Sequence, residues 1–273
     1  MKHLLLISNI SKDNSQLLDY AAAFCKHYNC KLHLLHVSEN TAPVLISSVY
    51  YYEQNNLDWT QQVENKIMRT LVSEVSEILS AEMVHSKIMA GNKEQILREF
   101  INENFIDLII VGNTDLDEES EFMDHKNLLV NILDTPLLVI PEYHNFEPLL
   151  SFNFLTTNSR TDIDDLMKLA KFFPESEITL THLEKNDTEL VVREKNWRSF
   201  VSTKIPGRIK HNIISEKIST YIRNENLAVQ KIQDAFVFTT RKRNFWRRLI
   251  DPSTTLGYLA GLEMPSVIFK ISE

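Results

Sequence analysis

Two runs of charged residues are the stretches of this sequence whose side chains could do chemistry, and the first is acidic. It spans residues 115–124 and holds six carboxylates. A calcium loop needs a glycine at its turn and a bidentate acid at its end, but Ser120 and Lys126 occupy these positions. We therefore expect a solvated acidic loop rather than a metal site. Its negative charge would also repel a triphosphate.

The second run, residues 241–248, is basic and contains Phe245 and Trp246. Basic residues interleaved with aromatic ones could bind RNA or single-stranded DNA, a small anion or phosphate, or a protein surface. The formal net charge of −8 disfavours a nucleic-acid-binding role. A structural or protein contact is the favoured alternative, and an anion site stays open.

Histidine and cysteine spacing indicates neither a metal site nor a catalytic nucleophile. His33 and His36 are three apart in an apolar run that is typical of a strand, so their side chains face opposite sides. Cys25 and Cys30 match no disulfide framework and no metal-binding spacing. With no nucleophile motif either, we expect no enzyme activity, and two unpaired cysteines favour a reducing cytoplasm.

Apolar runs place these residues in an α/β fold with parallel sheets. The run at 107–111 predicts a strand buried on both faces, followed by a loop at Gly112, a helix ending near residue 133 and a strand over 137–140. Ligands of such sheets bind at the carboxyl ends of the strands. Phosphate-binding loops there need glycine, yet the chain has only five glycines. The other expected strands span 4–8, 32–37 and 85–89, and the expected helices span 60–83 and 93–103, with 40–58 irregular or a short helix.

The series then repeats, which predicts two tandem domains at residues 1–143 and 149–273 with a linker at 142–149. Strands are expected over 150–156, 178–183, 234–238 and 265–269, and a capping-box pattern at Thr161 and Asp164 precedes a helix. The distance between matching positions falls from 146 at His36 and His182 to 127 at the aspartates that open the later strands. The second copy has therefore lost about one helix, the counterpart of 60–83.

Three anchors in this order resemble the universal stress protein family in a tandem arrangement. They are the segments 7–11, 34–37 and 107–112, the last followed by 136–141. The resemblance implies two HUP or Rossmann-like domains related by a pseudo-twofold axis. It also implies that the last strands, Leu137–Ile140 and Val267–Lys270, pair within the chain.

Nucleotide-binding members of the family carry a glycine-rich motif after the fourth strand and an aspartate after the first. Transferred to this chain, those positions depart from the motif in both domains. The implied site residues are Asn9, Gly112 and Asn113 in the first domain and Thr157, Thr239, Lys242, Ser253 and Thr254 in the second. We therefore expect no cofactor, and ATP or AMP bound at the divergent site of the second domain is the alternative.

The function that follows is that of a cytoplasmic, nonenzymatic stress-response module with an unidentified protein partner. No apolar run approaches the length of a membrane span, so no membrane association is expected. Whether the chain also forms a homodimer stays open.

Overall fold

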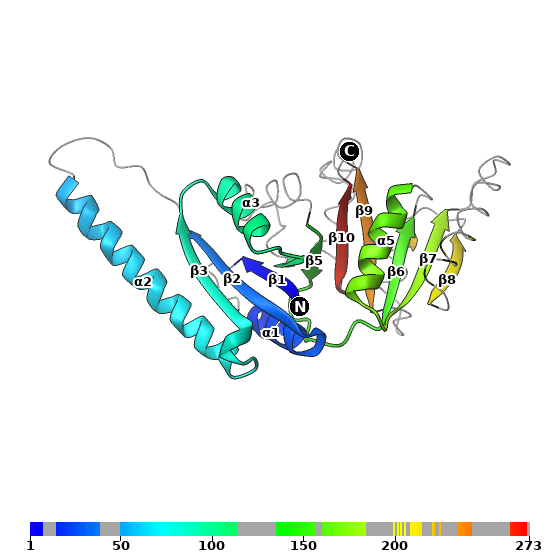
Figure 1. Ribbon diagram of the computed structural model, residues 1–273, viewed down its shortest axis with the longest axis horizontal. Helices are drawn as coiled ribbons and strands as arrows, with labels where there is room; N and C mark the ends of the chain where they lie inside the picture. Colours follow the sequence, from blue (N-terminus) through cyan, green and yellow to red (C-terminus); the bar gives the residue numbers. More distant parts are fainter. Residues whose placement is uncertain are drawn as a thin grey trace. The chain divides into compact units, whose positions relative to one another are not determined.

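The computed structural model describes residues 1–7, 15–38, 50–113, 135–156, 160–183, 199, 201, 203, 205, 208–214, 220–221, 224, 234–241 and 263–271. The chain divides into two compact units, Met1–Val111 and Gly112–Glu273. Figure 1 shows strands and helices in both units. The domain boundaries near residues 143 and 149 stay a prediction.

The described residues of the first unit form four parallel strands in the order β3-β2-β1-β4. Leu4 of β1 is opposite both Leu32 of β2 and Leu108 of β4, and Leu32 is opposite Val84 of β3. The elements are β1 (Lys2–Ile7), α1 (Ser15–Tyr28), β2 (Cys30–Ser38), α2 (Tyr50–Ser76), η1 (Ala81–Met83), β3 (Val84–Ala90), α3 (Lys93–Glu103) and β4 (Leu108–Gly112).

The described residues of the second unit form six strands in the order β5-β10-β9-β6-β7-β8. Only the β5–β10 pair among them is antiparallel, with Val139 opposite Ser266. The two units therefore divide before β5, although the sequence analysis assigns that strand to the first domain. The elements are β5 (Leu137–Ile140), β6 (Ser151–Thr156), α5 (Arg160–Phe172), β7 (Glu177–Leu183), β8 (Ile209–Ile214), β9 (Ala235–Arg241) and β10 (Ser266–Ile271).

The strand registers of the two units can be compared position by position. Leu32 and Ile178 hold matching positions in β2 and β7, and their partners are Val84 of β3 and Ile209 of β8. Val84 follows Leu32 by 52 positions, whereas Ile209 follows Ile178 by 31. The connection between these strands is therefore 21 residues shorter in the second unit than the connection that contains α2 in the first.

Two expected helix boundaries differ from the structure. Helix α2 begins at Tyr50, ten residues before the expected start, because no glycine or proline interrupts residues 50–60. It ends at Ser76, and η1 leads into β3. Helix α5 already begins at Arg160, so Thr161 lies inside its first turn and does not precede the helix. The expected helix ending near residue 133 lies outside the described residues.

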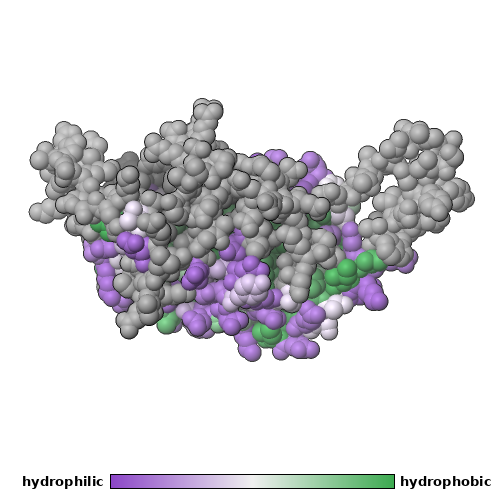
Figure 2. Space-filling view, turned by 180° about the vertical axis from the view of Figure 1, so that it is seen from behind, coloured by the Kyte–Doolittle hydropathy of each residue, from purple (hydrophilic) through white to green (hydrophobic). Residues whose placement is uncertain are grey.

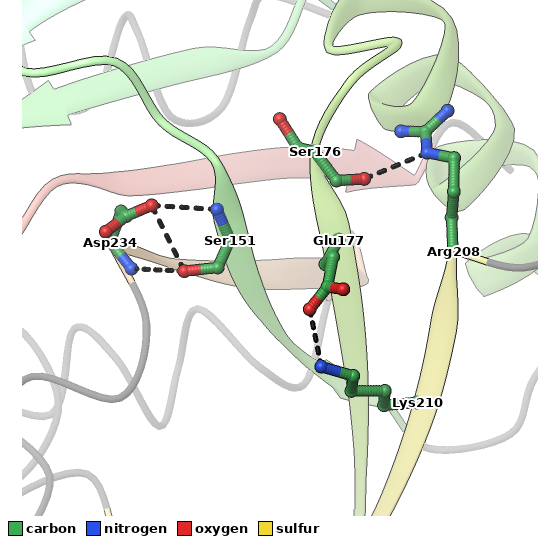
Figure 3. Close-up of polar contacts among 6 residues, drawn as sticks. All are labelled: Ser151, Ser176, Glu177, Arg208, Lys210 and Asp234. Carbon is green, nitrogen blue, oxygen red and sulfur yellow. Dashed lines mark hydrogen bonds and ion pairs between the residues drawn. The ribbon is translucent and has the colours of Figure 1, made fainter.

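An aspartate joins neighbouring strands at their amino ends in both units. Asp107 Oδ2 accepts the backbone N–H of His3 at 2.8 Å, and the backbone N–H of Asp107 donates to the His3 carbonyl. Asp234 Oδ2 accepts three hydrogen bonds, from the backbone N–H groups of Leu150 and Ser151 and from the Ser151 hydroxyl. Figure 3 shows the two bonds from Ser151. The repeated aspartate thus fixes the start of β1 and of β6.

Arg208 holds the carboxyl end of α5. Its guanidinium donates to the carbonyls of Ser176, Phe173 and Ala170 at 2.9, 2.5 and 3.4 Å, and Figure 3 shows the first of these bonds. The last carbonyls of a helix have no hydrogen-bond partner within the helix, and a cation there also interacts favourably with the negative end of the helix dipole. Burial lowers the pKa of Arg208.

The described surface is mostly hydrophilic on the face drawn in Figure 2, with hydrophobic areas between hydrophilic residues. The described large hydrophobic residues that remain exposed are Met1, Phe105, Tyr143, Leu150 and Met167. No helix in the described part of the chain is long and apolar enough to cross a membrane.

Candidate functional site

The carboxyl end of β4 carries Gly112 and Asn113, which the family resemblance places at nucleotide-binding positions. Gly112 is half-buried, and Asn113 is buried directly after it. The side-chain oxygen of Asn113 accepts the backbone N–H of Glu142 at 3.0 Å. Both residues of this bond belong to the second unit, so Asn113 has a structural contact at a position where nucleotide-binding relatives would contact their ligand.

The carboxyl end of β2 carries a polar cluster that the sequence analysis does not predict. The hydroxyl of Ser38 donates to Glu64 Oε2 of α2, and His36 Nε2 lies 3.5 Å from Glu64 Oε1. In a serine hydrolase the imidazole stands between the hydroxyl and the acid, so that it can take the serine proton. Here the carboxylate is in the middle. The cluster can attach α2 to β2, but it does not activate Ser38.

The matching edge of the second unit contains a buried carboxylate, Asp162 in the first turn of α5. Thr156 at the end of β6 donates to Asp162 Oδ2 at 2.7 Å, and Thr239 of β9 donates to Asp162 Oδ1 at 3.3 Å. Asp162 is fully buried. Thr239 was expected to stand at the first glycine of a phosphate loop. Its hydroxyl instead donates to a carboxylate, which would repel a phosphate group.

Asp165 lies one helical turn after Asp162 and is also buried, with 3% of its surface exposed. Its Oδ1 lies 3.6 Å from Lys168 Nζ, whereas its Oδ2 has no hydrogen-bond partner. Burial raises the pKa of Asp165 to about 6, with a further contribution from Asp162, although Lys168 opposes the shift. The base of α5 therefore holds two buried acids.

The sequence offers one signal for Asp162 and Asp165 that the sequence analysis does not use. Both acids share the helical face of Leu166 and Leu169, which is the buried face of α5. A carboxylate on the buried, apolar face of a helix needs a hydrogen-bond donor. For Asp162 the donors are Thr156 of β6 and Thr239 of β9.

Five of the expected nucleotide contacts lie outside the described residues, as do the acidic run 115–124 and the basic residues after Arg241. The five contacts are Asn9, Thr157, Lys242, Ser253 and Thr254. Within the described part, the structure brings Thr239 to Thr156 and Asp162, and Gly112 is followed by Asn113 at the end of β4.

The described histidines and cysteines form no metal-binding group of three or more possible ligands. Cys25 and Cys30 are buried and free, and burial raises the pKa of Cys30 to about 11. His33 and His36 point to opposite faces, as predicted, since His33 contacts His3 and His85 while His36 contacts Glu64.

Comparisons with known proteins agree with the fold. Universal stress protein A of Yersinia pestis is 24% identical over 140 residues, which are 51% of this chain and 91% of that protein. The corresponding protein of Escherichia coli strain K12 is 23% identical over 140 residues, 51% of this chain and 94% of the relative.

A solved structure resembles nearly the whole chain. The universal stress protein from Archaeoglobus fulgidus DSM 4304 has a TM-score of 0.61 and 11% sequence identity, and the match covers 99% of this chain and 97% of that one. At this identity the match shows a shared fold. The sequence model of the universal stress protein family matches residues 1–141, more than half of the chain, and the chain belongs to that family.

Proposed function

We propose that this chain is a cytoplasmic, nonenzymatic regulatory member of the universal stress protein family. It acts through a protein partner and binds no ATP in its first domain. The observation that carries the proposal is the hydrogen bonding of polar side chains to one another at the strand ends, above all of Asp162 to Thr156 and Thr239.

The Asp162 carboxylate opposes a phosphate group in the second unit. Like charges about 4 Å apart repel by roughly 1 kcal/mol in water and roughly 4 kcal/mol near a protein surface. A nucleotide phosphate beside Thr239 would have to bear this cost and replace the bond from Thr239 to the carboxylate. The edge at β6 and β9 is thus suited to holding α5 rather than an anion.

The residues that follow β4 support the same conclusion. The Asn113 side chain is bound to the backbone of Glu142. The acidic run at 115–124 follows directly in the sequence, where nucleotide-binding relatives have glycines. These polar and acidic residues are better suited to contact another protein than to bind a phosphate.

Isothermal titration calorimetry with ATP, ADP and AMP tests the proposal on the full chain. We expect no saturable binding tighter than about 1 mM, which corresponds to about −4 kcal/mol. A dissociation constant in the micromolar range for any of the three nucleotides would overturn it.

Two variants would then locate such a site. Loss of binding in Ser253→Ala would favour the alternative site in the second domain, which the sequence analysis places at Thr239, Lys242, Ser253 and Thr254. Binding that persists in Ser253→Ala but is lost in Asn113→Ala would instead assign the nucleotide to the first domain.

A further inference from the structure

Three histidines from three adjacent strands form a continuous chain of rings in the first unit. His3 Nδ1 lies 3.0 Å from His33 Nε2, and His33 Nδ1 lies 3.2 Å from His85 Nδ1. The ring centroids of the two pairs are 5.1 and 5.2 Å apart. The central ring, His33, is 2% exposed. We call these three residues the histidine chain.

Helix α3 covers the histidine chain with a single aromatic side chain. The Phe100 ring is stacked on His85 at 6.3 Å and meets His33 edge-on at 5.9 Å. Phe100 is itself buried, with 1% of its surface exposed. The charge on these rings therefore affects directly how well α3 packs on the sheet.

The hydrogen bonds of the histidine chain limit how many protons it can hold. A neutral imidazole has one N–H group and one acceptor nitrogen. Three neutral rings can satisfy both contacts, and so can three rings that share one added proton. A second added proton puts two N–H groups opposite each other in one contact, which breaks that hydrogen bond. The intact chain thus excludes the doubly charged state.

The surrounding groups oppose protonation as well. On the sheet, Lys31 precedes His33 by two residues on β2, and Lys87 of β3 lies 6.0 Å above the Phe100 ring. Among the described residues, no carboxylate forms an ion pair with the three rings. The exposed Asp107 before β4 accepts only the backbone N–H of His3, and the α3 residues Glu94 and Glu99 bond to Arg98 and Gln95.

We propose that the histidine chain is a pH-sensitive latch that holds α3 on the sheet near neutral pH and releases it in mild acid. Burial, with further contributions from His3, His85 and Lys31, lowers the pKa of His33 to about 4, and burial also lowers the pKa of His85. A lowered pKa means that the open state binds protons more readily than the closed state. The latch is therefore closed above about pH 6.5 and weakens as the pH falls toward 4.

Hydrogen–deuterium exchange of the full chain at pH 7.5 and pH 5.0 tests the latch, after correction for the pH dependence of intrinsic exchange. Linkage at His33 predicts that the protection of α3 amides falls about 30-fold at pH 5.0. Helix α5 serves as the internal control, because the position that matches His33 in the second unit is Thr179. Protection of α5 should not fall, and protonation of its buried Asp165 should raise it.

Variants separate the latch from a general acid effect. His33→Thr, which introduces the residue of the second unit, should reduce the pH response of α3 to about threefold or less. His27→Gln removes an exposed histidine of α1 outside the chain and should keep the full response. If His33→Thr does not fold, the wild-type measurement still decides. Unchanged α3 protection at pH 5.0, or an equal loss in α3 and α5, overturns the proposal.

Discussion

The two units have the same strand order, β3-β2-β1-β4 and β8-β7-β6-β9, but they carry different side chains at matching positions. The registers match His3 with Ser151, His33 with Thr179 and His85 with Lys210. The three titratable rings of the first unit thus correspond to the neutral residues Ser151 and Thr179 and to Lys210 in the second. Lys210 forms an exposed ion pair with Glu177 (Figure 3). Apolar strands and register preserve the fold, while the polar positions are free to diverge.

The same divergence occurs on the opposite face of each sheet. In the first unit, His36 contacts Glu64 of α2. In the second unit, where the connection between β7 and β8 is shorter than the one that contains α2, the matching His182 is fully buried and its ring is stacked on His211 at 5.6 Å. A histidine of β8 thus replaces the contact that a helix residue makes in the first unit.

The largest effect is expected from Arg208→Met. Methionine is chosen because Met83 holds the matching position in the first unit. The change removes three hydrogen bonds from a cation to backbone carbonyls at the end of α5. We expect the free energy of unfolding of the second unit to fall by about 3 kcal/mol. Urea denaturation followed by circular dichroism measures it. A loss below about 0.5 kcal/mol would show that Arg208 is dispensable.

A smaller difference is expected between the two aspartates that start the strands. Asp234→Ala removes the acceptor of three hydrogen bonds and should cost about 2 kcal/mol. Asp107→Ala removes the acceptor of the His3 N–H bond at an exposed position and should cost about 1 kcal/mol. Urea denaturation of both variants gives the comparison. Equal costs, or a larger cost for Asp107→Ala, would contradict it.

The smallest effect is a gain in stability from Asp165→Asn. The raised pKa of Asp165, about 6, means that its ionised form destabilises the fold at neutral pH and that this cost is lost as the pH falls toward 4. We expect the variant to gain about 1–2 kcal/mol at pH 7.5 and little at pH 4.5. Exchange protection of α5 measures this, with the exposed Asp164→Asn as the matched control. A gain that is equal at both pH values would exclude the titration of Asp165 as its cause.

Much of the fold could be predicted because buried strands are marked by uninterrupted apolar runs. The bounds of α3 and β5 agree with the predicted Lys93–Glu103 and Leu137–Ile140. The sequence does not predict strand β8, because Ile-Lys-His-Asn-Ile-Ile is neither a continuous apolar run nor a regular alternation of apolar and polar residues. The strand lies at the edge of the sheet. Its existence follows only from its pairing with β7.

The candidate site was less predictable because its contacts depend on register and helix placement. Thr239 was singled out, but its partner Asp162 lies 77 positions away in a helix whose start was misplaced. The histidine chain joins residues 30 and 52 positions apart. A single sequence shows residue types and the positions of strands. These contacts also depend on the register between three strands, which a single sequence does not show.

The most direct test of the proposed function is whether the purified chain carries a bound small molecule. Mass spectrometry of the supernatant after denaturation measures this without assuming a ligand. Because Asp162, Thr156 and Thr239 bond to one another and Asn113 bonds to Glu142, we predict no stoichiometric nucleotide. Recovery of ATP, ADP or AMP at about one molecule per chain would contradict the proposal.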